Sequence, residues 1–193
     1  MENEVTEIIR ETKLLGVVIN DHLTWDSNTH SLVKRSNARM RLLHKLVEFS
    51  IPQDDLLTIY VLYIRSILEQ SCQVWHSSLT LENTMDLERV QKNALKIILK
   101  EEYLSYENAL EKMNIESLYD RRTTLCLKFA KACTKSTQVK NLFPENKQSD
   151  LNFRFPEKYQ VTMARTDRLK DSAVPYMQRL LNDDFLNREK NSS

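Results

Sequence analysis

Most of the chain carries apolar side chains at helical spacing, and this pattern predicts a mainly helical fold. Apolar stripes run along residues 26–47 and 80–99, and residues 53–71 are apolar nearly all round, as expected for a central, buried helix. Shorter stripes predict two further helices over residues 105–113 and 117–135. We therefore expect a bundle of about five helices.

The positions predicted to face the core repeat every three or four residues, which places each set on one side of its helix. In chain order they are Leu32, Ser36, Met40, Leu43, Val47, Leu62, Leu87, Val90, Ala94, Ile97, Ile98, Leu118, Leu125, Cys126, Phe129 and Cys133. Trp25 and Trp75 stand at the edges of apolar runs, where an aromatic side chain completes a core more often than it stacks on a base.

The two ends of the chain differ from its helical middle. Runs rich in β-branched residues at positions 7–9 and 13–19 predict one or two short strands, or a hairpin. From residue 136 onward, two prolines and a polar stretch interrupt the periodicity. We expect a loosely structured tail there, with a short helix near residues 174–182.

These patterns divide the chain into four segments. They are a strand or hairpin in residues 1–25, a three-helix bundle in residues 26–100, two further helices in residues 101–135 and a partly irregular extension in residues 136–193. Asp26 or Ser27 is expected to cap the first helix, and Thr80 the third.

Composition narrows the classes of function. The net charge is +1, so overall charge does not indicate a nucleic-acid partner. The single glycine, Gly16, excludes the glycine-rich loops of nucleotide-binding proteins and the G-x-S-x-G turn of hydrolases. Three scattered cysteines without a C-x-x-C pair favour reduced thiols in a cytoplasmic or nuclear protein. An acidic start and the lack of a long apolar run predict a protein that is neither secreted nor membrane-spanning.

Local charge is more informative than net charge. Residues 27–47 contain no acidic side chain, and helical geometry places Lys34, Arg41 and Lys45 on one solvent face. The helices over residues 80–99 and 117–135 repeat the arrangement, with the cations Arg89, Lys92 and Lys96 and then Arg121, Lys128, Lys131 and Lys135. Cations spaced along rigid helices suit a phosphate backbone. The alternative is an ordinary solvated surface on a helical scaffold or protein-interaction module that does not bind nucleic acid.

A family resemblance favours the first interpretation. Residues 13–26 (KLLGVVINDHLTWD) resemble the K-x-L-G-V-x-[IL]-[DN]-x-x-L-x-W motif of reverse transcriptases from jockey-like, non-long-terminal-repeat retrotransposons. In that family the motif follows the catalytic palm and forms the hairpin called the primer grip, and the next helices form the thumb. The resemblance implies primer-grip positions at Leu14, Leu15, Gly16 and Val17.

The resemblance continues in order along nearly the whole chain. It includes residues 55–60 (DLLTIY), 63–69 (YIRSILE), 74–79 (VWHSSL) and 87–98 (LERVQKNALKII), followed by shorter matches in residues 118–122, 164–168 and 175–182. The chain differs from the family at Ser66 and Gln73, where proline is usual, and at Gln70, where an aromatic residue is usual.

The family's polymerase holds two metal ions with an F/Y-A-D-D aspartate pair and a further palm aspartate. The 193 residues contain no such motif, so the resemblance implies a non-catalytic, C-terminal part of an RNA-directed DNA polymerase. Its implied partners are an RNA or DNA template-primer duplex and the missing palm and fingers portion of the parent protein. An upstream exon or reading frame that carries the palm is a further possibility.

Other groups of residues give weaker evidence for a catalytic or metal-binding site. His76, Ser77 and Ser78 could be combined with an aspartate into a triad, but adjacency does not supply triad geometry, and a loop after a buried Trp75 is the better interpretation. The four histidines lack zinc-ligand spacing, so no metal and no cofactor are predicted. Arg122 falls near an apolar stripe, where a structural ion pair is expected.

Overall fold

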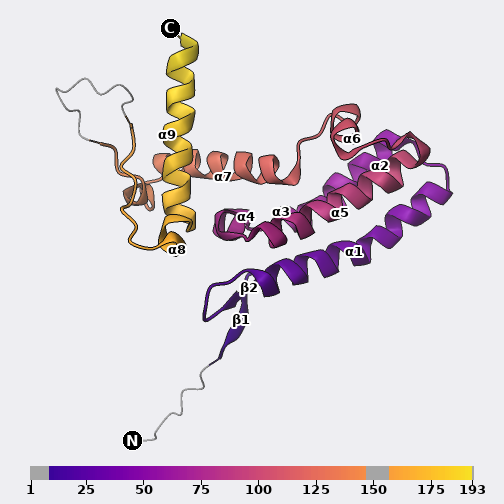
Figure 1. Cartoon of the computed structure of the whole chain (residues 1–193), viewed down its shortest axis with the longest axis horizontal. Coiled ribbons are helices and arrows are strands. Elements are labelled where there is room, and N and C mark those ends of the chain that lie inside the picture. Colours follow the sequence, from indigo (N-terminus) through magenta and orange to yellow (C-terminus); the bar gives the residue numbers. More distant parts are fainter. Residues whose placement is uncertain (1–8, 147–156, 193) are drawn as a thin grey trace, which may run out of the picture. The chain divides into compact units, whose positions relative to one another are not determined.

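The computed structural model describes residues 9–146 and 157–192, and these fall into two compact units (Figure 1). Unit 1 consists of the described residues up to Gln70 together with Leu79–Ile115, and unit 2 of Ser71–Ser78 together with the described residues from Glu116 onward. The predicted fold class, mainly helical with an N-terminal β-hairpin, is confirmed. No helix in residues 9–146 and 157–192 has the length and apolarity needed to cross a membrane.

Unit 1 begins with an antiparallel hairpin of β1 (Glu11–Leu14) and β2 (Val17–Asn20). The predicted strand over residues 13–19 is interrupted, because Leu15 and Gly16 both have positive φ and form a two-residue turn. Two positive φ values are what a tight turn needs to match the twist of its strands. Of the strand predicted at residues 7–9, Ile9 lies in no strand and the other two lie outside the described residues.

The helices of unit 1 largely follow the predicted boundaries. They are α1 (Asp26–Glu48), α2 (Gln53–Ile59), the π-helical η1 (Tyr60–Arg65), α3 (Ser66–Glu69), α5 (Leu81–Leu99), the short η3 (Lys100–Glu102) and α6 (Tyr106–Lys112). Thr80 caps α5 as predicted, since its side-chain oxygen accepts from the backbone N–H of Asn83 at 3.1 Å. The predicted cap of α1 is wrong, because its N-cap is Trp25 and no side chain bonds there.

The predicted core stripes of α1 and α5 are confirmed, with Val47 and Ile97 only partly buried. The prediction that Leu62 is buried is wrong, because this side chain is 71% exposed. It lies in η1, where the wider π-helical turn changes the face that each residue presents, so the even apolar pattern of residues 53–71 does not mean burial on every side.

A buried chain of hydrogen bonds attaches α6 to the rest of unit 1. The Tyr60 hydroxyl donates to Gln91 Oε1 at 2.8 Å, and Gln91 Nε2 donates to the Tyr106 hydroxyl oxygen at 2.9 Å. Tyr106 in turn donates to a carboxylate oxygen of Glu88. Burial raises the pKa values of both tyrosines, so their hydroxyls stay protonated as donors. These bonds connect α6 to the other helices of unit 1.

Unit 2 contains the short α4 (Cys72–Trp75) and η2 (His76–Ser78), α7 (Leu118–Lys135), η4 (Lys140–Leu142), α8 (Asp167–Lys170) and α9 (Ala173–Ser192). The core formed where α7 meets α9 contains Cys126, Ala130, Cys133, Phe143, Met177 and Leu181. Trp75 is fully buried, as predicted, but in unit 2 rather than in the three-helix bundle.

Two predictions within unit 2 need correction. Phe129, predicted to face the core, is half-exposed, and Ala130 lies in the core instead. The short helix predicted near residues 174–182 is the 20-residue α9, whose Met177 and Leu181 pack against α7. Tertiary packing thus extends a helix whose own apolar pattern is weak.

Candidate nucleic-acid interface

Of the six basic residues of unit 1 predicted to bind nucleic acid, Lys96 lines a groove between α1 and α5. The two helices are side by side and run in the same direction (Figure 1). At their starts, Asp26 of α1 accepts a hydrogen bond from the Asn83 amide of α5 at 2.8 Å. Further along, His44 of α1 and Lys96 of α5 line one shared groove. The seam therefore has two ends, and Lys96 belongs to the second.

The groove at this end has a volume of about 360 Å³ and is lined by side chains of both helices. They are Asn37, Met40, His44, Asn93, Lys96 and Ile97. No carboxylate lines the groove, and its amide and ammonium groups offer N–H donors of the kind that contact phosphate oxygens. Its floor is formed partly by the apolar Met40 and Ile97.

The three cations predicted on α1 are all exposed. Lys34 stands three residues before the groove residue Asn37, and Arg41 three residues before His44. Side chains three apart are neighbours on one helix face, so Lys34, Arg41 and Lys45 form a row along the α1 edge of the groove.

The three cations predicted on α5 are also exposed, but their surroundings differ. Lys96 lines the groove itself and lies 5.5 Å from the ring centre of Tyr103. Arg89 pairs with Asp86 at 2.8 Å, an exposed contact that restrains the arginine weakly. Lys92 lies 5.1 Å from the ring centre of Tyr106 in α6, which places it on the side away from the groove.

Two further arginines of the basic stretch are structural. Arg35 donates from both terminal nitrogens to Gln70 Oε1, at 3.2 Å each. Arg39 donates to the Tyr63 carbonyl oxygen at 2.6 Å and lies over the Tyr63 ring, 4.2 Å from its centre. Both therefore hold α1 against the η1–α3 segment, and neither belongs to the row at the groove.

The hairpin turn presents the residues that resemble a primer grip. Leu14 and Leu15 are exposed, and Leu15 is 88% exposed at positive φ, whereas Val17 is buried. The Gln70 amide donates to the Leu15 carbonyl oxygen at 3.4 Å and lies against Gly16. Leu14 and Leu15 are thus exposed at a turn that the Gln70 side chain holds in place.

The structure also bears on the triad that His76 could have joined. Its Nδ1 accepts from Arg122 Nε at 3.3 Å, and its Nε2 lies 3.1 Å from the Thr123 hydroxyl. Burial, and then the charge of Arg122, lower the His76 pKa to about 3, so the ring is neutral at ordinary pH. Both ring nitrogens are engaged by residues that are neither aspartate nor Ser77, so His76 takes part in no triad here.

Arg122 lies among buried groups of unit 2. It is fully buried, bonds to His76 and has its guanidinium carbon 5.7 Å from the ring centre of Trp75. The predicted ion pair of Arg122 stays a prediction. Within the described residues, no group of three or more His, Cys, Asp or Glu side chains could hold a metal ion.

The sequence analysis did not identify the uncharged polar residues that line the groove. Asn37, His44 and Asn93 are not charged, so a search for basic residues passes over them. The available signal was their spacing, because each stands three or four residues from a predicted cation of its own helix. No protein-family model, curated protein or solved structure matches the chain.

Proposed function

We propose that this chain binds the sugar-phosphate backbone of an RNA or DNA duplex at the α1–α5 groove. The observation that carries the proposal is a row of three exposed cations on α1 beside a groove that has polar donors and no carboxylate. Lys96 lines the groove from α5, and Arg89 stands four residues before the groove residue Asn93. Lys92 lies farther out and contributes less.

The arrangement favours backbone contacts over reading of base sequence. Lys34, Arg41 and Lys45 advance along a straight helix by four to seven residues, or roughly 6 to 10 Å at the rise of an α-helix. Cations at such intervals along one helix face can each contact a different phosphate. Each neutralised phosphate releases counterions, so binding of this kind is sequence-independent and weakens with salt.

The resemblance adds a context to this proposal. We propose that the chain is a non-catalytic, C-terminal part of a retrotransposon reverse transcriptase, with a primer-grip-like hairpin at residues 14–17 and a thumb-like bundle. Its expected partners are the template-primer duplex and the palm and fingers of the parent protein, in the cytoplasm or nucleus. The exposed Leu14 and Leu15 support a contacting role for the turn, because apolar side chains at a solvent-exposed turn contribute nothing to the core.

The proposal is tested by replacing Lys34, Arg41 and Lys45 together with glutamine and measuring duplex binding over a range of salt concentrations. Affinity is expected to fall for every sequence, and the slope of log K against log salt to lose roughly 0.7 to 0.9 for each contact removed. The apolar stripe is untouched, so the thermal melt should be unchanged.

The matched control replaces Lys128, Lys135 and Lys140, three exposed lysines of unit 2, with glutamine. Equal losses from both triple variants would mean diffuse charge attraction, and no loss from either would favour the scaffold alternative. Lys131 is left out of the control because it pairs with Asp184 at 2.6 Å, so its removal would also disturb the α7–α9 contact.

Lack of polymerase activity is a separate part of the proposal. The purified chain, supplied with magnesium or manganese, should not extend a primer, because no palm aspartates are present to hold the metal ions. Template-dependent incorporation of nucleotides above a no-protein control would overturn this part and leave the binding proposal standing.

A further inference from the structure

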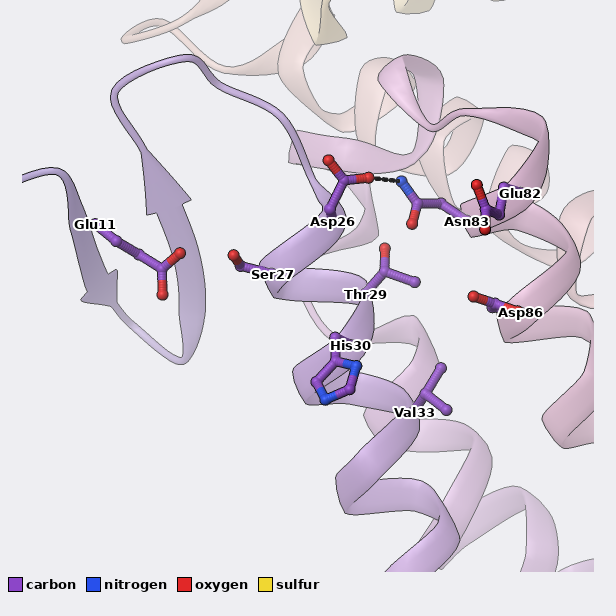
Figure 2. Close-up of a pocket in the computed structure, with 9 residues that line it drawn as sticks. All are labelled: Glu11, Asp26, Ser27, Thr29, His30, Val33, Glu82, Asn83 and Asp86. Carbon is purple, nitrogen blue, oxygen red and sulfur yellow. Dashed lines mark hydrogen bonds between the residues drawn. The ribbon is translucent and has the colours of Figure 1, made fainter.

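The opposite end of the α1–α5 seam holds a larger cavity of reversed charge. It has a volume of about 660 Å³ and lies between β1 and the first turns of α1 and α5 (Figure 2). The carboxylates that line it are Glu11, Asp26, Glu82 and Asp86. No lysine or arginine lines it, although the lining residue Asp86 pairs with Arg89. The cavity therefore carries an excess of negative charge.

Helix geometry explains only part of this charge. Asp26 and Glu82 lie in the first turns of two parallel helices, where a carboxylate offsets the positive end of the helix dipole. Asp26 also accepts the hydrogen bond from Asn83. Glu11 belongs to β1 and caps no helix, yet Figure 2 shows its carboxylate directed toward the α1 side of the cavity. Glu11 therefore adds an exposed negative charge to the cavity that the helix dipoles do not account for.

A second observation is independent of the acidic side chains. Thr29 lines the cavity and is only 2% exposed, and its hydroxyl has no hydrogen-bond partner among the described residues. Figure 2 shows the side chain between α1 and α5, with the hydroxyl oxygen toward the Asp26–Asn83 pair. An unsatisfied buried hydroxyl is unfavourable, so its presence at this cavity points to a ligand that supplies the missing hydrogen-bond partner.

The lining also indicates the chemical class of that ligand. The described residues contain no cluster of three or more side chains that could hold a metal ion, so the carboxylates are too dispersed for one small cation. An organic cation differs in two respects, because it carries N–H donors for hydroxyl and amide oxygens and can place several charges along an extended chain. A cavity of about 660 Å³ has room for such a chain.

The geometry points to a binding site for an extended alkylammonium cation, either a free polyamine or a lysine-rich peptide segment. Its ammonium groups are held by Glu11, Asp26 and Glu82, and one of them donates to the Thr29 hydroxyl. This site is distinct from the proposed nucleic-acid groove, since it has the opposite charge and lies at the other end of the seam.

The test is a calorimetric titration of the full chain with spermidine and, separately, with a tri-lysine peptide. Two variants probe the site. In Glu11→Gln with Glu82→Gln, affinity should fall at least tenfold. In Thr29→Val, which keeps the shape and removes the hydroxyl, affinity should fall several-fold, while the thermal melt stays the same or rises because an unsatisfied group has gone.

The matched control is Asp55→Asn with Glu101→Gln, two exposed acidic residues of unit 1 away from the cavity. It changes the net charge by the same amount and should bind as tightly as the parent chain. The tighter of the two titrants identifies the source of the cation. Binding of neither, equal weakening in the control, unchanged affinity in Thr29→Val, or Mg²⁺ binding as tight as that of spermidine would overturn the proposal.

Discussion

The side-chain amide of Gln70 occupies the space into which a Cβ on Gly16 would project. The same amide donates to the Leu15 carbonyl oxygen at 3.4 Å, and its oxygen accepts from Arg35. A line of contacts thus runs from the hairpin turn through the end of α3 to α1. The chain's single glycine therefore suits the positive φ of this turn, and a Cβ there would force the Gln70 amide to shift.

Replacing Gly16 with alanine should destabilise unit 1 by about 1 to 3 kcal/mol, because it adds a clash to an unfavourable backbone conformation. The measurement is urea unfolding followed by Trp25 fluorescence in a Trp75→Phe background, since Trp25 lies in unit 1. In the double variant with Gln70→Ala, part of the loss should be recovered. Strictly additive losses would show that the Gln70 contact does not matter.

Replacing Leu15 with asparagine should stabilise the hairpin by up to about 1 kcal/mol, because asparagine tolerates positive φ better than leucine does. If the exposed leucine contacts nucleic acid, duplex binding should weaken in the same variant. The matched control is Leu23→Asn, since Leu23 also has positive φ and is 51% exposed. A similar gain in stability without a loss of binding is expected there, and a binding loss in both would count against the hairpin as a contact.

Trp75→Ala and Leu62→Ala should have very different costs. Trp75 is fully buried, so its truncation should reduce stability by about 3 to 5 kcal/mol. Leu62 is largely exposed, so its truncation should change stability by less than about 0.5 kcal/mol. Thermal melts by circular dichroism compare the two, and a large loss from Leu62→Ala would mean that this surface is covered in solution.

The sequence predicted most of the helices because their apolar stripes are regular. Leu32 and Leu43 in α1, and Leu87 and Ala94 in α5, lie where the stripe placed them. The burial of Leu62 was predicted wrongly because a helix that is apolar all round does not indicate which of its faces points to the core. The π-helical turn then determines which face is covered.

For the candidate site, the exposure of the cations was predicted from the sequence, but the groove was not. Lys34, Arg41 and Lys45 could be placed in solvent from helical geometry alone. The groove depends on α5 lying parallel to α1, a tertiary arrangement that no local pattern specifies. The same holds for the acidic cavity, where Glu11 meets residues more than seventy positions away.

The rate of thiol labelling should measure how often unit 2 opens, independently of unit 1. All three cysteines are buried free thiols of unit 2, and burial raises the pKa of Cys133. The hydrogen bond with Cys72, together with burial, raises the pKa of Cys126. Because the thiolate is the reactive form, a disulfide reagent should modify them only as fast as unit 2 opens. Labelling should accelerate in Trp75→Ala and stay unchanged in Gly16→Ala. Rapid labelling of the native chain would contradict this.

His76 should make unit 2 sensitive to acid. Its pKa is lowered from 6.5 to about 3, first by burial and then by the charge of Arg122, so between these values the unfolded chain binds a proton that the folded chain does not. Stability from this group is therefore complete above about pH 6.5 and falls as the pH decreases toward 3. The loss from about pH 7 to about pH 5 should be roughly 2 kcal/mol.

The measurement is urea unfolding at several pH values, followed by the fluorescence of Trp75 in a Trp25→Phe background. His76→Gln is the comparison variant, because an amide can still accept from Arg122 and donate to Thr123 but does not titrate in this range. The variant can be less stable at neutral pH, yet its stability should vary less with pH by the same roughly 2 kcal/mol. Parallel pH profiles for the two proteins would show that folding does not lower the His76 pKa, and would contradict this prediction.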